Sequence, residues 1–80
     1  MQVSFTEHAR ERMAERGIPE EAVYAVLRNW DSCRPAPRSG RSVGTTMIYT
    51  GSYGGRNLKV YVLVEGRNPI RVQTAVWQGD

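Results

Sequence analysis

The pattern of apolar and polar positions changes along the chain from a helical period to a strand period. Ala9 and Met13 lie four residues apart, which is the spacing of one face of a helix. Ser4 starts an S-x-x-E sequence of the capping-box type, so this helix is expected to begin near Ser4 or Thr6. Gly17 can supply the left-handed residue that ends a helix. The pattern therefore predicts a first helix that closes at Gly17.

A second helix is predicted from the segment IPEEAVYAVLRN, at residues 18–29. Pro19 suits the first position of a helix, and the two glutamates after it favour the positive end of the helix dipole. Its apolar face is broader than that of the first helix and consists of Ala22, Val23, Val26 and Leu27. Residues 30–44, WDSCRPAPRSGRSVG, show no periodicity, and their prolines and glycines predict a flexible loop.

Three strands are predicted between about residues 45 and 77, in the segments TTMIYT, NLKVYVLVE and IRVQTAVW. One face of the second strand consists of Leu58, Val60, Val62 and Val64. In the third, the alternation sets Ile70, Val72, Thr74 and Val76 against Arg71, Gln73, Ala75 and Trp77. GSYGG and GRNP have the composition of the hairpin turns that would join the strands.

These elements predict an α+β fold. Two N-terminal helices, at about residues 5–29, would pack on a three- to four-stranded antiparallel sheet. The chain has 80 residues, no internal repeat and no change of composition that would mark a second domain. It is therefore expected to form a single domain over residues 1–80.

Charge and composition narrow the class of protein without naming a reaction. The net charge is +3, and ten of the eleven basic residues are arginine, which fits phosphate but is also favoured by GC-rich genomes. The longest apolar run, VYVLV, is far shorter than the roughly 20 residues of a membrane span. No secretory signal is visible, so a cytoplasmic location is expected. Cys33 is the single cysteine, which rules out an internal disulfide.

The face of the predicted sheet opposite the helices carries residues typical of a nucleic-acid-binding surface. They are Lys59, Tyr61, Arg71, Gln73 and Trp77, with Arg38 and Arg41 expected to reach in from the loop. Aromatic rings offer stacking surfaces to bases, and cationic side chains offer donors to phosphates. The alternative is an ordinary solvent-exposed sheet face.

The first helix carries the chain's single histidine. His8, Arg12 and Arg16 are spaced four apart, which lines them up along one side of the helix. A histidine can move protons in phosphodiester cleavage, and the two arginines could stabilise the charge that develops at phosphorus. These three are the candidate catalytic residues; the alternative is an exposed helix face. No metal-ligand spacing is present, so no metal or other cofactor is expected.

Two stretches resemble a known family: FTEHARERMAERGIPEEAVYAVL, and YTGSYGGRNLKVYVLVEGRNPIRVQTAVW. The first contains H-A-x-x-R-M-x-x-R-G-I in full, at residues 8–18. This motif is typical of domain-of-unknown-function family 4258, a family of small bacterial domains. The resemblance covers nearly the whole chain apart from the arginine-rich loop.

That family is similar in turn to the barnase–RelE-like ribonuclease toxins. The resemblance implies helices on a curved antiparallel sheet, metal-independent cleavage or binding of RNA, and often an acidic antitoxin protein as partner. It places His8, Arg12 and Arg16 at polar helix positions of the family, and Thr74 where members often have a threonine in the last strand. The second helix departs from the family, because it begins with IPEE where a Ser or Thr cap is commoner.

These features lead to two hypotheses of different class. The first is a small metal-independent endoribonuclease of the toxin–antitoxin type, which acts on RNA and pairs with an acidic antitoxin. The second is a non-catalytic module that binds RNA or a protein, as a monomer or as a weak homodimer joined through a strand edge.

Overall fold

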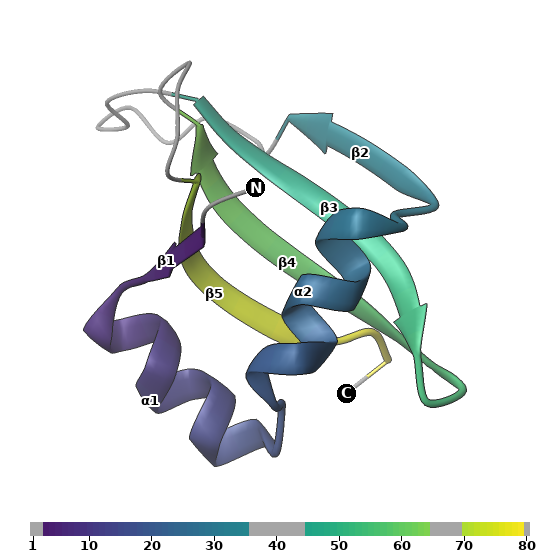
Figure 1. Ribbon diagram of the computed structural model, residues 1–80, viewed down its shortest axis with the longest axis horizontal. Coiled ribbons are helices and arrows are strands. Elements are labelled where there is room, and N and C mark those ends of the chain that lie inside the picture. Colours follow the sequence, from purple (N-terminus) through teal and green to yellow (C-terminus); the bar gives the residue numbers. More distant parts are fainter. Residues whose placement is uncertain (1–2, 36–44, 65–69, 80) are drawn as a thin grey trace.

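The computed structural model describes residues 3–35, 45–64 and 70–79, which contain two helices and five strands (Figure 1). In chain order these are β1 (Val3–Phe5), α1 (Glu7–Arg16), α2 (Glu20–Arg28), β2 (Ser32–Pro35), β3 (Thr45–Tyr53), β4 (Arg56–Val64) and β5 (Ile70–Trp77). The predicted α+β class and the N-terminal position of both helices are confirmed. In the described part of the chain, neither helix is long and apolar enough to cross a membrane.

The sheet formed by the described residues has five strands in the order β1-β5-β4-β3-β2, rather than the three to four predicted. It is also mixed, because β1 runs parallel to β5 while the other three strand pairs are antiparallel. The two additional strands are the edge strands, with three residues in β1 and four in β2. In a segment of three or four residues, the alternation of apolar and polar positions that marks a strand cannot be recognised.

Strand β2 lies within the segment that was predicted to be a loop. Ser32–Pro35 pairs antiparallel with residues 47–50 of β3. The Asp31 backbone N–H donates to the Thr50 carbonyl at 2.7 Å, just before this pairing starts. The loop prediction is therefore wrong for residues 32–35. Residues 36–44 lie outside the described residues, and so do the predicted loop arginines Arg38 and Arg41.

The hairpin between β3 and β4 closes through two glycines. Gly54 and Gly55 have φ values of 61° and 82°, which L-residues with a side chain rarely adopt. Positive φ at both central residues is the hairpin geometry that matches the twist of the flanking strands. The turn is shorter than the predicted GSYGG segment, because Tyr53 still pairs with Arg56. The second predicted turn, GRNP, lies outside the described residues.

The first helix starts at the later of its two predicted positions. Thr6 is the cap of α1, and its Oγ1 accepts a hydrogen bond from the Ala9 backbone N–H at 3.0 Å. Ser4 instead belongs to β1, where it pairs with Arg71. Gly17 ends α1 in the left-handed conformation with φ 66°, which confirms the predicted stop.

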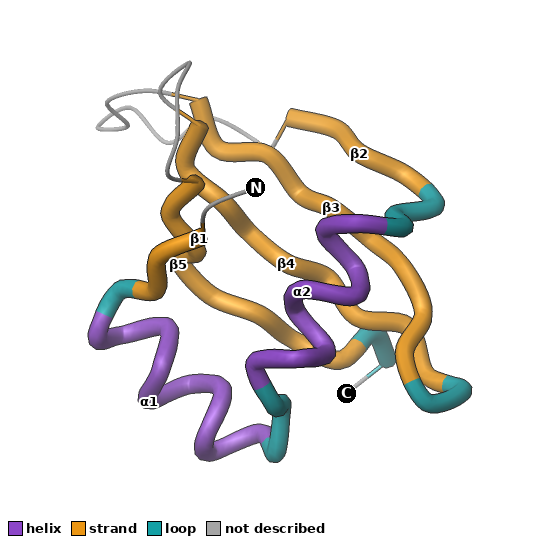
Figure 2. Tube along the Cα trace, viewed as in Figure 1, coloured by secondary structure: helices purple, strands orange, loops and turns teal. Residues whose placement is uncertain are grey.

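The two helices take different positions on the sheet (Figure 1, Figure 2). Helix α2 packs over β3 and β4, whereas α1 packs against β5 at the side of the sheet. Gly51 allows α2 to approach β3 closely, because a Cβ there would lie 3.2 Å from the Asn29 carbonyl oxygen and 3.3 Å from the Val26 side chain. The buried core is made of Ala9, Met13, Ile18, Ala22, Val23, Val26, Leu27, Leu58, Val60, Val62, Val72, Ala75 and Trp77.

Candidate nucleic-acid interface

A β-bulge in β5 decides which of its side chains reach the side of the sheet away from the helices. Tyr61 pairs with Thr74 and Val62 pairs with Val72, so Gln73 is the extra residue. The side chain of Gln73 contacts Thr46 of β3, which lies on the side away from the helices. Gln73 and Thr74 therefore reach the same side as Tyr61, although they are neighbours in the sequence.

We call this side the open face. By register it includes Ser32, Arg34, Thr46, Ile48, Thr50, Lys59, Tyr61, Leu63, Arg71, Gln73, Thr74 and Val76. Most of these side chains are half-buried, and Arg71 is exposed. Both helices pack on the other side, so no helix of the described residues covers the polar groups of this face.

Trp77 does not belong to the open face, and its predicted position there is wrong. It is 7% exposed and lies in the core with Ala75. Its indole Nε1 donates to the Arg16 carbonyl oxygen at 2.9 Å, and the Arg56 guanidinium carbon lies 4.4 Å from the ring centroid. The indole N–H and the ring surface therefore both contact other residues of the protein. The bulge causes this difference from the prediction. Its extra residue reverses the alternation of the residues that follow it, so Thr74 lies on the open face and Trp77 lies in the core.

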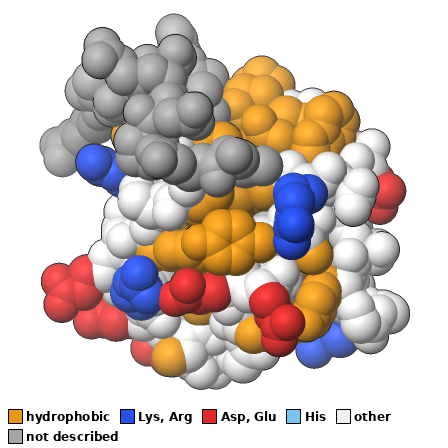
Figure 3. Space-filling view, in the orientation of Figure 1, with side chains coloured by type: hydrophobic (Ala, Val, Ile, Leu, Met, Phe, Trp, Pro, Cys, Tyr) orange, Lys and Arg blue, Asp and Glu red, His pale blue; other side chains and the backbone are white. Residues whose placement is uncertain are grey.

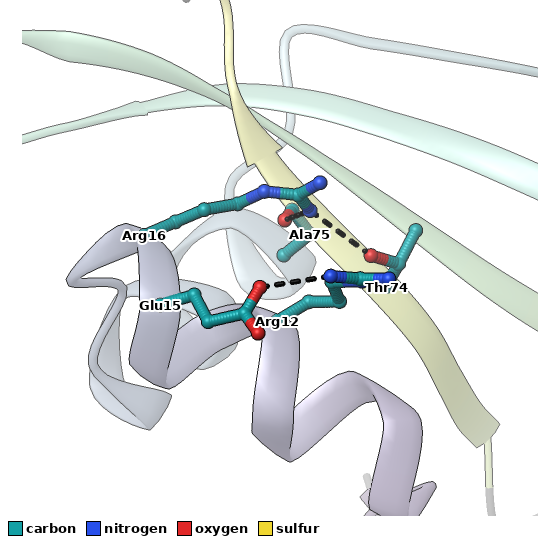
Figure 4. Close-up of polar contacts among 5 residues, drawn as sticks. All are labelled: Arg12, Glu15, Arg16, Thr74 and Ala75. Atoms are coloured by element: carbon teal, nitrogen blue, oxygen red, sulfur yellow. Dashed lines mark hydrogen bonds and ion pairs between the residues drawn. The ribbon is translucent and has the colours of Figure 1, made fainter.

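Arg16 brings α1 to the border of the open face (Figure 4). Its Nη1 donates to the Ala75 carbonyl oxygen at 2.8 Å and to Thr74 Oγ1 at 3.3 Å. β1 covers this edge of β5 only up to Val72, whose carbonyl oxygen accepts from the Thr6 backbone N–H at 3.2 Å. The Arg16 guanidinium thus satisfies an edge carbonyl beyond the end of β1 and lies next to an open-face hydroxyl.

The other two candidate catalytic residues, Arg12 and His8, lie earlier on α1. Arg12 Nη1 donates to Glu15 Oε1 at 2.8 Å, in an ion pair whose side chains are 43% and 61% exposed. In Figure 4 the Arg12 side chain extends from α1 toward β5. His8 is exposed on the first turn of the helix. Arg16 is the residue of this group that contacts the sheet, whereas the Arg12 ion pair stays within α1.

The predicted binding residues of the strands are brought together only in part. Lys59 and Tyr61 are alternate residues of β4 and share the open face, with Thr74 directly across from Tyr61. Arg71 lies further along β5, across from Leu63. The sequence interpretation missed Thr46, although the alternation of TTMIYT already groups it with the polar Thr50 on one side of its strand.

The donors on and beside the open face are cationic or neutral. They comprise ammonium, guanidinium, hydroxyl and amide groups, which hydrogen-bond to phosphates and to base edges. Within residues 3–35, 45–64 and 70–79, no three His, Cys, Asp or Glu side chains come together as metal ligands. The face is thus suited to binding an anion that also carries flat rings.

The opposite side of the molecule has a different character (Figure 3). Hydrophobic side chains remain visible there between charged residues, and Trp30, 48% exposed, contacts the Tyr49 ring edge-on at a centroid distance of 5.9 Å. Burial raises the pKa of Tyr49, and the neighbouring Cys33 thiol raises it further. Arg10 lies over the Phe5 ring on this side, with its guanidinium carbon 5.3 Å from the centroid, but it also forms an ion pair with Glu20 at 2.6 Å. Its charge is thus already paired with a carboxylate, and acidic side chains are visible around it (Figure 3), so this side is the weaker candidate for a polyanion.

Comparison with known proteins supports the family suggested by the sequence motif. The family described as "Domain of unknown function (DUF4258)" matches residues 5–77. Neither the curated proteins nor the solved structures yielded a match. The matched segment runs from the end of β1 to the end of β5, and it includes α1 and the open-face residues of β4 and β5. The chain therefore belongs to the DUF4258 family.

Proposed function

We propose that this protein binds single-stranded RNA on the open face of its sheet. One observation carries the proposal: the bulge in β5 sets Thr74 across from Tyr61, and Arg16 of α1 reaches that same threonine. Thr74 thus has Tyr61 across from it on the neighbouring strand and the guanidinium of Arg16 at its hydroxyl. Lys59 adds an ammonium group on the strand of Tyr61.

The chemistry of these groups favours a single strand over a duplex. An unstacked base can lie on the half-buried Tyr61 ring, while Lys59 and Arg16 bind the phosphates on either side of it. A paired base would keep its flat faces within the stack and could not use the ring. The net charge of +3 adds a general attraction for a polyanion, which predicts affinity that falls as salt rises.

The place of Arg16 favours a second candidate function, metal-independent RNA cleavage of the toxin–antitoxin type. Cleavage requires that the 2′-hydroxyl loses a proton as it attacks phosphorus, and that the 5′-oxygen gains one as its bond breaks. His8 would act as the general base or acid, and Arg12 and Arg16 would stabilise the charge on the phosphorane. An acidic antitoxin protein would compete with RNA for the same cationic groups.

Binding is tested by fluorescence anisotropy with a labelled single-stranded RNA of mixed sequence, in EDTA. Tyr61→Leu removes the stacking ring but keeps apolar bulk, and we expect a loss in affinity of about tenfold or more. Lys59→Ala should weaken binding by roughly fivefold and reduce its salt dependence. Arg28→Ala is the charge-matched control, because Arg28 ends α2 on the covered side, and its effect should be small. Equal losses from Lys59→Ala and Arg28→Ala would contradict binding at the open face.

Cleavage is tested separately by incubating the wild type, His8→Gln and Arg12→Ala with total cellular RNA in EDTA. If the protein is a ribonuclease, fragments form without metal, and His8→Gln abolishes them while its circular dichroism spectrum stays unchanged. Intact RNA with the wild type would reject cleavage and leave the binding proposal standing. Cleavage at full rate by His8→Gln would remove the histidine from the mechanism.

A further inference from the structure

Arg34 is an exposed residue of the edge strand β2, and it lies on the open face of the sheet. It pairs with Ile48 of β3, whereas the preceding residue, Cys33, pairs with Tyr49. Tyr49 belongs to the side of the helices, where its ring contacts Trp30. Because successive side chains of a strand point to opposite faces, Arg34 points to the open face.

The strand register places Arg34 in one row with the proposed binding residues. Ile48 of β3 lies across from Arg34 on one side and from Tyr61 on the other. Thr74 continues the row across from Tyr61, and the Arg16 guanidinium binds its hydroxyl. Directly opposite residues of antiparallel strands have their Cβ atoms about 5 Å apart, so the row is continuous across the sheet. An arginine therefore stands at each end of a row that contains the Tyr61 ring.

The strands around this row carry cationic side chains and no carboxylate. The described strands β1 to β5 contain no Asp or Glu. The two ion pairs formed by the described residues join side chains of the helices. No carboxylate of these strands therefore competes with a phosphate for Arg34, whose planar guanidinium can donate two parallel hydrogen bonds to phosphate oxygens.

We propose that Arg34 binds a backbone phosphate, so that the RNA strand crosses the sheet from α1 to β2; this inference rests on the proposed binding of single-stranded RNA. Arg16 and Lys59 flank the base that lies on Tyr61. Arg34 binds the phosphate that follows the one at Lys59. β2 lies two inter-strand spacings from β4, about 10 Å, so the RNA must extend beyond the nucleotide on Tyr61 to reach it. The contact adds affinity without selecting a base.

The first test measures how salt changes the affinity for a fluorescein-labelled RNA of eight uridines, by anisotropy in EDTA. Arg34→Gln keeps most of the side-chain length but removes the charge. We expect roughly fivefold weaker binding at about 0.1 M salt, and a slope of log affinity against log salt that is smaller by about 0.7, because one phosphate fewer is neutralised. Arg34→Lys keeps the charge and should keep the wild-type slope.

Arg28→Gln is the charge-matched control for the first test. Arg28 ends α2 on the covered side of the sheet, so this variant should keep the wild-type slope although it loses the same charge as Arg34→Gln. Circular dichroism of each variant checks that it is folded before its affinity is measured.

The second test replaces the long probe with the dinucleotide UpU, measured as a competitor. UpU carries one phosphate, so a molecule stacked on Tyr61 reaches Arg16 or Lys59 but not β2. Arg34→Gln should therefore bind UpU within about twofold of the wild type, although it loses about fivefold with the long probe. Tyr61→Leu should weaken the binding of both, since both use the ring.

The outcomes separate this inference from the proposed function. A wild-type affinity and slope in Arg34→Gln would overturn the contact at β2, while RNA binding stands if Tyr61→Leu weakens it. Equal losses with UpU and the long probe, or an equal loss in Arg28→Gln, would reveal a general effect of charge and also overturn it. A slope in Arg34→Lys as small as that in Arg34→Gln would do the same. If the wild type binds neither these probes nor mixed-sequence RNA, the proposed function itself fails.

Discussion

At the scale of single residues, Trp77 connects α1 to the core through one hydrogen bond. A buried indole needs an acceptor for its N–H, and the last carbonyls of a helix lack partners within the helix. The bond from Trp77 Nε1 to the Arg16 carbonyl oxygen satisfies both needs, because Arg16 is the last residue of α1. The Arg56 guanidinium lies over the ring and occupies part of its surface.

Replacing Trp77 with Phe keeps an apolar ring but removes the N–H donor. We expect a loss of about 1–2 kcal/mol in the free energy of unfolding, because the Arg16 carbonyl loses its partner and part of the ring volume is lost. Trp77→Ala should cost about 3–5 kcal/mol. Urea unfolding followed by circular dichroism measures both.

RNA affinity gives a second readout on the same residue. Under conditions where Trp77→Phe is folded, its affinity for single-stranded RNA should equal that of the wild type, since the ring lies on the covered side. A large loss of affinity with unchanged stability would instead place Trp77 in the binding surface, as the sequence alone predicts.

At the scale of elements, the outer edge of strand β5 is covered first by β1 and then by α1. β1 pairs with residues 70–72 of β5, and α1 continues along the same strand beyond that point. The Arg16 guanidinium then binds the Ala75 carbonyl oxygen at 2.8 Å. The part of β5 beyond residue 72 lies at the edge of the sheet, and covering its backbone groups in this way protects it from pairing with another chain.

Two arginines of α1 should therefore differ in what they contribute to stability. Arg16→Ala leaves an edge carbonyl without its charged donor, and we expect a cost of about 1 kcal/mol, which lowers the midpoint temperature by about 4–8 °C in a domain of this size. Arg12→Ala breaks an exposed pair with Glu15 and should cost about 0.5 kcal/mol or less. Thermal unfolding without RNA compares them, and equal midpoints would show that Arg16 does not stabilise the edge.

At the scale of the whole molecule, two tyrosine hydroxyls of β3 connect this strand to neighbouring elements. Burial raises the pKa of Tyr49, and Cys33 of β2 raises it further through a hydrogen bond and its charge. Partial burial raises the pKa of Tyr53 as well, and the Glu21 carboxylate of α2 adds to the effect. In both cases the folded state favours the neutral phenol.

These shifts predict lower stability in alkali. Because both pKa values are raised above the ordinary value of 10.0, the stabilisation is fully present below pH 10 and is lost as the pH rises through the folded-state values. The urea midpoint of the wild type should therefore fall between pH 9 and pH 11. Tyr49→Phe and Tyr53→Phe should each fall less steeply over that interval. A wild-type midpoint that does not change over this interval would contradict the assignment.

The sequence pattern was sufficient to predict those features of the fold whose physical cause lies in neighbouring residues of the chain. The burial of Leu58, Val60 and Val62 follows from alternation along one strand, and the end of α1 follows from the left-handed conformation that Gly17 allows. The family motif likewise needs no coordinates. The α+β class could therefore be predicted from the chain alone.

Tertiary structure decided the features that depend on a distant partner. β1 and β2 exist because β5 and β3 offer edges to them, which no period within three or four residues can reveal. The segment IRVQTAVW alternates without a break in the sequence, yet the bulge at Gln73 exchanges the faces of Thr74 and Trp77. Alternation is a property of one strand, whereas register belongs to two. The candidate residues were therefore visible in the sequence, but which of them share a surface was settled only by the pairing of β4 with β5.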